Sequence, residues 1–270
     1  TEIYTLSLHD ALPILNFFLT ITTFCYFQVQ METFFGKDFQ NGPFVLFSTQ
    51  HLIAIFGIIL VGILIILTQR KAAPSQRLKI RWLMAIILVI NESTWHLWNW
   101  SIGEWSIQTM LPLHLCSILV WLCAYMLITK NHLIYEFAYL IGIAGALQAV
   151  LTPDLGQYAF PHYRYFQVFI SHGLIIISAL YMTIVEGFRP TWQSVKRVAI
   201  YGNLYFLFVF ILNKIIGSNY LFIAHKPETA SLLDVLPPWP YYILIIELLA
   251  AFFILLFYAP FAIKDRKKKK

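Results

Sequence analysis

The chain has 270 residues, of which 59% are hydrophobic and only 12% are charged, and its formal net charge is +6. An ordinary soluble domain carries about a quarter charged residues, so this composition argues against a soluble globular protein and indicates lipid as the solvent. Three cysteines are an odd number and imply no disulfide framework. The basic residues stand in short clusters between apolar segments, which is typical of membrane topology rather than of nucleic-acid binding.

The first segment, residues 1–30, does not look like part of the fold. It lacks a starting Met, and its opening TEIYTLSLHDALPI resembles the translation of a sequencing adapter. Residues 14–27 are apolar but too short to span a bilayer comfortably, and no small-residue cleavage site follows them. We interpret residues 1–30 as a non-native or disordered extension and expect Met31 to be the true start.

Seven later segments are apolar over roughly the 20 residues that a transmembrane helix requires. They predict an all-α, polytopic membrane bundle with seven helices over residues 31–263, followed by a basic tail at residues 264–270. The loops between them are too short to hold a soluble domain. The predicted spans cover about residues 47–68, 82–100, 110–129, 133–153, 165–186, 196–216 and 239–263.

Most of the 19 lysines and arginines lie in the first, third and fifth loops and in the tail. Short cytoplasmic loops retain basic residues, so the sequence predicts a cytoplasmic carboxyl terminus and an amino terminus outside. Four tryptophans near the outer end of the second span indicate an interfacial belt. They are Trp95, Trp98, Trp100 and Trp105.

Polar residues of several spans converge on the outer half of the bundle. Glu92, His96 and Asn99 follow an i, i+4, i+7 spacing and therefore share one helix face. Ionisable residues inside a membrane usually mark function, so we expect an outward-opening polar pocket that binds a substrate. Lys214 either pairs with a carboxylate or extends to the interface. The other expected pocket residues are Gln148, Asp154 and Arg164.

Three chemistries fit these residue types. Cys116 with His172 or His114 could act as a nucleophile and base for acyl transfer, and Ser117 is a competing nucleophile. His172 is the better base, because His114 and Cys116 point about 200° apart on a regular helix. Zn²⁺ or haem ligation by the histidines is a weaker alternative, and we expect no metal and no cofactor.

Longer motifs carry a family resemblance from about Met31 to the end. METFFGKDFQNGPFVLFSTQHLIAIF, ESTWHLWNW, LPLHLCSILVW and the HG at His172 resemble bacterial YwaF-type integral membrane proteins, with LPLHLC the most specific part. Those proteins are similar to the eukaryotic transmembrane protein 164 family, which moves fatty acyl chains onto ether phospholipids with a Cys and a His. The resemblance implies that His172 is that His. In that family the Cys directly precedes the His of the motif that LPLHLC resembles. Here that His is His114, and Leu113 occupies the position of the Cys.

The leading hypothesis is therefore a lipid acyltransferase or acyl hydrolase of the plasma membrane, with phospholipid or fatty-acyl substrates. The alternative is a non-enzymatic transporter or small-ligand receptor that uses the same polar pocket. A third hypothesis is a structural or assembly partner, for which Gly142 and Gly145 could support helix association.

Overall fold

The computed structural model describes residues 23, 28, 30–227 and 232–268. The predicted extension at residues 1–30 lies almost wholly outside this part of the chain. Within the described residues the secondary structure is entirely helical, as the sequence predicted. In chain order the elements are α2 (Thr49–Gln69), α3 (Pro74–Ser101), α4 (Leu115–Thr129), α5 (His132–Phe137), η1 (Ala138–Gly142), α6 (Ile143–Leu151), α7 (Tyr163–Ile184), α8 (Trp192–Ile216), η2 (Tyr220–Phe222), η3 (Leu232–Val235) and α9 (Tyr241–Lys268).

The elements α5, η1 and α6 follow one another without a break and together fill the fourth predicted span. The middle element, η1, is a π-helical segment, a wider turn that appears mostly as single-turn bulges within α-helices. Every other predicted span also corresponds to one helix, with ends that differ by a few residues, except that α3 begins at Pro74 and so includes the basic residues before residue 82.

Five of these helices are long and apolar enough to cross a membrane: α2, the continuous helix formed by α5, η1 and α6, α7, α8 and α9. The helix α3 has 28 residues, but the polar side chains of its outer half make it less apolar. The helix α4 is apolar and has only 15 residues. The chain is therefore a multi-pass membrane protein, while the count of seven spans and the orientation remain predictions.

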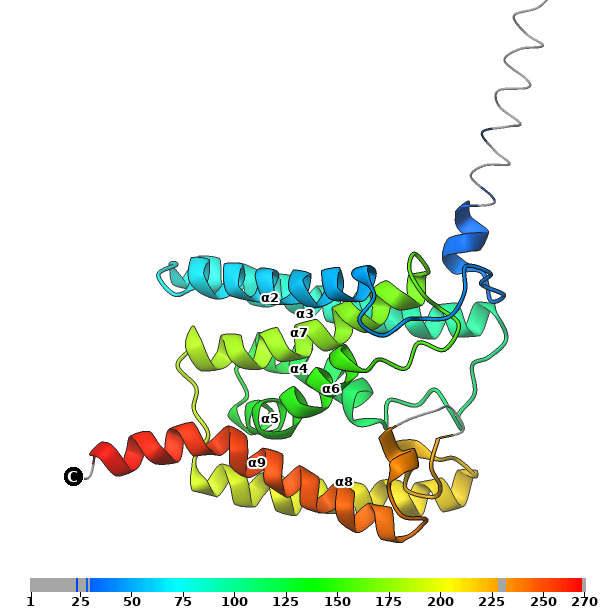
Figure 1. The fold of residues 1–270 in the computed structure, drawn as a ribbon. Coiled ribbons are helices and arrows are strands. Elements are labelled where there is room, and N and C mark those ends of the chain that lie inside the picture. The colour runs from blue at the N-terminus through cyan, green and yellow to red at the C-terminus, as the bar shows by residue number, and fades with distance from the viewer. Residues whose placement is uncertain (1–22, 24–27, 29, 228–231, 269–270) are drawn as a thin grey trace, which may run out of the picture.

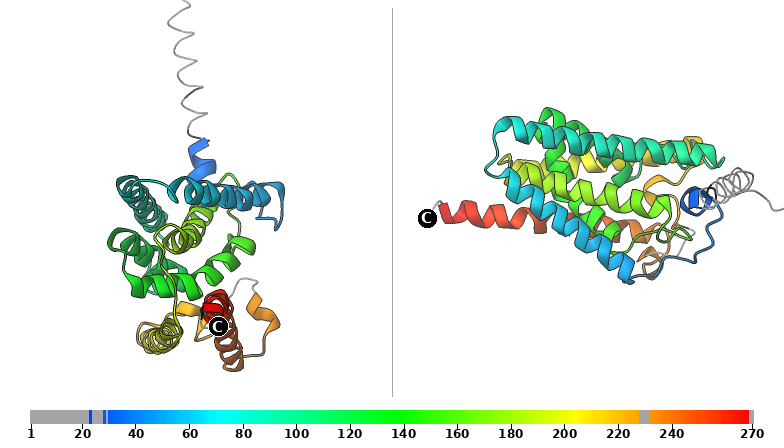
Figure 2. Two further views of the ribbon diagram at one scale, coloured as in Figure 1. Left: turned by 90° about the vertical axis from the view of Figure 1, so that its left-hand side faces the viewer. Right: turned by 90° about the horizontal axis from the view of Figure 1, so that it is seen from above.

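The helix α7 lies at the centre of the bundle and packs against α2, α3, α4, η1 and α6 (Figure 1). Close approach to α2 depends on Gly173, because a Cβ added there would lie 2.9 Å from Ile58. The helices α8 and α9 lie side by side along one flank of the bundle (Figures 1 and 2). They contact it mainly through α5 and η1.

The main hydrophobic core forms between α3, α4, α5, η1 and α7. Its fully buried side chains include Leu88, Leu119, Tyr135, Leu140, Ile175 and Tyr181. By contrast, α2, α8 and α9 expose large apolar side chains along most of their length, such as Ile53, Ile215 and Leu248. Such surfaces suit contact with acyl chains, because a bilayer interior solvates apolar groups as well as a protein core does.

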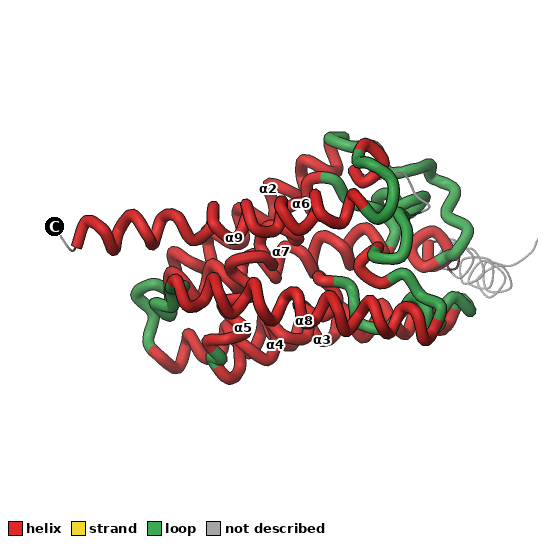
Figure 3. Tube along the Cα trace, turned by 90° about the horizontal axis from the view of Figure 1, so that it is seen from below, coloured by secondary structure: helices red, strands yellow, loops and turns green. Residues whose placement is uncertain are grey.

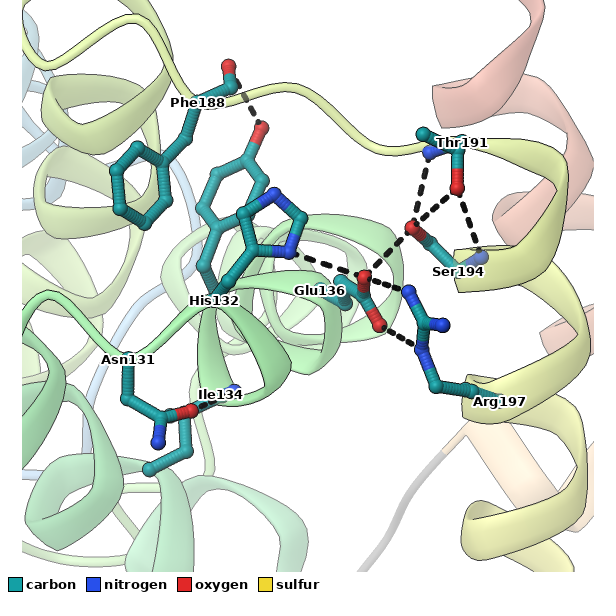
Figure 4. A network of polar contacts seen from close by, with 9 residues as sticks. Asn131, His132, Ile134, Glu136, Phe188, Thr191, Ser194 and Arg197 are labelled. Atoms are coloured by element: carbon teal, nitrogen blue, oxygen red, sulfur yellow. Dashed lines mark hydrogen bonds and ion pairs between the residues drawn. The ribbon is translucent and has the colours of Figure 1, made fainter.

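We call the end of the bundle with the predicted cytoplasmic loops the basic end; it comprises residues 69–81, 129–136, 185–197 and 264–268. Buried carboxylates join its helices. Glu136 is fully buried and accepts hydrogen bonds from Ser194 Oγ at 2.7 Å and from both Nε and Nη2 of Arg197 (Figure 4). It also accepts from His132 when Nδ1 of that histidine is protonated. Glu186 pairs with Arg81 and Lys130.

Candidate functional site

A buried polar ladder joins α3 to α7 in the half of the bundle away from the basic end. Asn91 Nδ2 donates to Ser171 Oγ at 2.6 Å and to the Gln167 carbonyl at 3.0 Å. Gln167 Nε2 also donates to Ser171 Oγ, at 3.3 Å. All three side chains are buried. Hydrogen bonds of this kind fix the relative position of two membrane helices, because the surrounding hydrocarbon offers these polar groups no other partner.

Arg164 lies next to this ladder, in the first turn of α7. Its guanidinium lies over the Trp95 ring, 3.8 Å from the ring centroid, and donates to Gln167 Oε1. Stacking on an indole face stabilises a guanidinium that has lost much of its water. Arg164 also interacts electrostatically with Glu92 and Asp154. The structure therefore joins α3 and α7 around one half-buried positive charge.

Glu92 and His96, predicted to share one face of α3, do face each other. Trp105 Nε1 donates to His96 Nδ1 at 3.2 Å, so the ring proton lies on Nε2, which is 3.9 Å from Glu92 Oε1. Asn99, the third member of that face, donates instead to the Trp95 carbonyl of its own helix, at 2.8 Å. Glu92 is buried, and its charge also acts on Cys116.

His172 follows directly after the ladder. Its Nδ1 lies 2.7 Å from the Val168 carbonyl, which can only accept, so Nδ1 carries the proton and Nε2 has a free lone pair. This tautomer is the one that a general base requires. The positive charge of Arg164 reaches the His172 ring. His172 is thus a neutral imidazole at the edge of the polar ladder.

Cys116 and Ser117 are the second and third residues of α4. The first N–H groups of a helix lack acceptors within it, so this turn is a place where backbone donors can stabilise an oxyanion. Cys116 Sγ faces α6, because a Cβ added at Gly145 would lie 3.9 Å from it. Both side chains are half-buried. The structure places both candidate nucleophiles in one turn.

His114 and His51 have structural contacts. His114 occupies the N-cap position of α4, and its Nδ1 accepts from the Leu221 N–H at 3.3 Å, between the rings of Tyr220 and Phe222. His114 therefore precedes the first helical turn of α4, which contains Cys116 and Ser117. His51 is fully buried and bonds through both ring nitrogens, to the Phe47 N–H and the Val150 carbonyl.

The remaining expected pocket residues lie nearer the surface. Gln148 is exposed at the end of α6, and Asp154 is exposed in the following loop. Lys214 is exposed in the last turn of α8, with Nζ 5.7 Å from the Phe210 ring centroid. The structure therefore gathers Glu92, His96 and Arg164 around the ladder, and leaves Gln148 and Lys214 at its margins.

Of the four tryptophans expected to form an interfacial belt, Trp98 does not fit, because it is buried, and the membrane depth of the other three stays a prediction. Only Trp100 is widely exposed, at 73%. Trp98 is buried and donates to a backbone carbonyl, while Trp95 carries Arg164 and Trp105 holds His96. Tryptophan spacing alone could not separate interfacial rings from packed ones, because both kinds occur at the same depth.

A segment whose position the sequence did not predict lies across this end of the bundle. We call residues 35–44 the strap. Three consecutive carbonyls in it accept side-chain hydrogen bonds: Phe35 from Trp98 at 2.8 Å, Gly36 from His162 at 3.1 Å and Lys37 from Gln157 at 2.8 Å. Most loops gather at the same end (Figure 3).

Two ionisable groups anchor the strap. Burial lowers the pKa of His162 below its ordinary value. The Gly36 hydrogen bond opposes this with a smaller effect, and the nearby charge of Arg164 lowers the pKa slightly further. The ion pair with Glu104 raises the pKa of Lys37. His162 is therefore neutral in the folded protein near pH 7, and its Nδ1 can cap α7 by accepting from the Arg164 N–H.

Metal ligation was a weak alternative from the sequence. Across residues 30–227 and 232–268, no group of three or more His, Cys, Asp and Glu side chains is arranged to hold a metal ion. The histidines of the described bundle instead bond to separate backbone and indole groups. The polar ladder, Arg164 and His172 thus remain as the candidate site.

Comparison with known proteins gives one match. No curated protein and no solved structure matches the chain. The family model described as the TMEM164 family matches residues 46–258, which include all the candidate site residues named above. Because the match covers most of the chain, this multi-pass membrane protein belongs to the TMEM164 family.

Proposed function

We propose that the protein is an enzyme that transfers or hydrolyses the acyl groups of membrane lipids, with His172 as its general base. The observation that carries the proposal is the His172 tautomer: Nδ1–H is held by the Val168 carbonyl, and Nε2 is left free to take a proton. Membership of the TMEM164 family supports a membrane-embedded site. The resemblance to bacterial relatives favours the plasma membrane.

Acyl transfer at this site needs a nucleophile, a base and a donor for the developing negative charge. In the proposed reaction, the sulfur of Cys116 or the oxygen of Ser117 attacks the carbonyl carbon of a lipid ester. The nucleophile's proton passes to His172 Nε2 and then to the departing alkoxide as the ester C–O bond breaks. A hydroxyl of a second lipid, or water, reverses these steps and releases the acyl group.

The polar ladder supports this chemistry by holding its parts still. Asn91 and Gln167 fix α7 against α3, and Gln167 also holds Arg164. The first turn of α4 supplies N–H donors for the tetrahedral oxyanion. Since Leu113 stands where the family Cys is expected, Cys116 and Ser117 are both tested as the nucleophile.

The test is covalent labelling of the purified protein in lipid nanodiscs, with a thiol-reactive acyl probe and a fluorophosphonate probe. We expect His172→Ala alone to abolish labelling. One of the two single variants Cys116→Ala and Ser117→Ala should also abolish it, and that variant identifies the nucleophile. The matched control is Cys123→Ala, since Cys123 is fully buried in the core. Thermal unfolding of each variant shows that it is folded.

Two results would contradict the proposal. If the wild type labels no more than His172→Ala, no acyl-enzyme forms through this base. In that case the transporter or receptor alternative gains support, and the next measurement is binding of polar solutes by Arg164→Gln and Glu92→Gln. If only Cys123→Ala loses labelling, the site lies elsewhere.

A further inference from the structure

Every described carboxylate at the basic end already has a basic partner. Glu186 lies 3.5 Å from Arg81 Nε and also pairs with Lys130. Glu136 pairs with Arg197 (Figure 4), and Asp265 accepts from Arg189 through both oxygens, each at 2.6 Å. These pairs lock the loops to one another. They leave no further carboxylate of the described residues at this end to neutralise the remaining cations.

The remaining basic residues at this end are numerous and exposed. The ion pairs at this end use Arg81, Lys130, Arg189 and Arg197 instead. Arg77 donates to the carbonyls of Gln69, Arg70 and Val185. The exposed cations come from the α2–α3 hairpin, the start of α8 and the end of α9. They are Arg70, Lys71, Lys79, Lys196, Lys264, Arg266 and Lys267.

Two exposed tryptophans indicate the depth of these cations. Trp82 is 45% exposed and lies three residues from Lys79, while Trp192 is 50% exposed and lies four residues from Lys196. Residues three or four apart are neighbours on a helix surface, and exposed tryptophans favour the level of lipid headgroups. The ammonium groups therefore lie within reach of phosphates. In Figure 1 the end of α9 extends beyond the bundle at this same end.

The opposite end has a different charge pattern. Lys37 pairs with Glu104, Arg164 is held by Gln167 and Trp95, and Lys226 Nζ donates to the Leu236 carbonyl at 2.7 Å. Exposed Asp38 and Asp154 add negative charge there. Lys214 is exposed at this end as well, but exposed Asp38, Asp154 and Asp234 outnumber it, so the two ends differ in the balance of their exposed charge.

We infer that the basic end is a binding surface for acidic phospholipids, whose anionic headgroups neutralise the exposed lysines and arginines. The carboxylates at this end are already paired, so the exposed cations need another anion. The exposed tryptophans favour lipid over an acidic protein as its source, because they place these cations at headgroup level. Each basic residue at a membrane surface contributes roughly a fivefold gain in binding to anionic lipid. The inference does not depend on the proposed acyl chemistry.

Native mass spectrometry of the detergent-solubilised full chain tests this surface with phosphatidylglycerol, and with phosphatidylcholine as the zwitterionic comparison. We expect Lys71→Gln/Lys79→Gln to weaken phosphatidylglycerol binding roughly tenfold or more, and 0.5 M salt to weaken it in the wild type. The matched control is Lys214→Gln/Lys226→Gln, which removes the same charge from the opposite end.

Equal loss in both double variants would overturn the inference, because net charge rather than a surface would then control binding. Equal binding of both lipids would do the same. Displacement of the lipid by millimolar inorganic phosphate would assign the site to free phosphate instead. None of these results depends on whether His172→Ala retains acyl labelling, so the two proposals fail separately.

Discussion

Single side chains at the basic end have two roles in this protein. The sequence assigned Lys130, Arg189 and Arg197 to membrane orientation, and each also pairs with a carboxylate on another element. Glu136 shows why this matters: a fully buried carboxylate is costly unless several donors compensate it, and His132, Ser194 and Arg197 all do so (Figure 4). The same residues thus orient the helices and hold them together.

At the opposite end, His162 makes strap stability depend on pH. Its pKa is lowered in the folded state, so the unfolded chain binds more protons between the folded pKa and about 6.5. Stability from His162 is therefore present above about pH 6.5 and is lost as pH falls through the folded pKa. We expect amide exchange in residues 35–44 to quicken between pH 7.5 and pH 5, after correction for intrinsic rates.

The matched variant is His162→Asn, which keeps a side-chain acceptor for the α7 N-cap but does not titrate. Its strap should exchange at a rate that varies little over this range. The same acid response in both proteins would show that another group controls the strap.

At the scale of elements, helices approach most closely where glycine removes the side chain. Gly142 and Gly145 of the continuous α5–η1–α6 helix face Leu119 and Leu115 of α4, at 2.9 Å and 3.2 Å from an added Cβ. Gly173 does the same for α7 against α2, where three atoms of Ile58 would lie within 3.2 Å. Small residues at helix contacts are typical of membrane bundles, where close packing replaces the hydrophobic effect.

Gly173→Ala should destabilise the bundle by about 1–3 kcal/mol, because Ile58 is β-branched and cannot easily turn away. The control is Gly202→Ala in the exposed part of α8, where nothing lies within 4 Å of the added Cβ. There we expect a gain of about 0.5–1 kcal/mol from helix propensity. Thermal and denaturant unfolding in detergent measure both, and a similar change in the two variants would refute the packing argument.

At the scale of the whole molecule, α7 organises a bundle to which α8 and α9 are attached along one side (Figure 2). The long apolar faces of α2, α8 and α9 face outward, while the polar ladder lies inside between α3 and α7. The charged loops and the strap lie at opposite ends. This arrangement fits a bundle that crosses the membrane along its length.

Orientation follows as a prediction for the intact protein. Ser75→Cys at the basic end and Gln108→Cys at the opposite end both introduce exposed thiols. In right-side-out vesicles, a membrane-impermeant maleimide should label Gln108→Cys and spare Ser75→Cys, and inverted vesicles should give the reverse. The wild type gives the background from native cysteines. Labelling of both variants from one side would contradict the prediction that α3 crosses the membrane between these two positions.

Sequence by itself determined the features that follow from composition and periodicity. Seven apolar segments located all the long helices, and the spacing of Glu92 and His96 placed them on one face, because helix geometry is local. The polar character of the outer half was also visible, since ionisable residues stand out in an apolar chain. Gly142 and Gly145 were also expected to support a helix contact, but the sequence indicated neither their partner α4 nor the contact of Gly173 with α2.

Only the tertiary structure decided which polar groups meet. The tautomer of His172 depends on the Val168 carbonyl, the hydrogen bond accepted by His114 on the distant Leu221 N–H, and the position of the strap on three donors from separate elements. The pairing of Glu136 with Arg197 likewise joins residues 61 positions apart. Such contacts depend on how whole helices pack, and a local pattern carries no information about a partner so far along the chain.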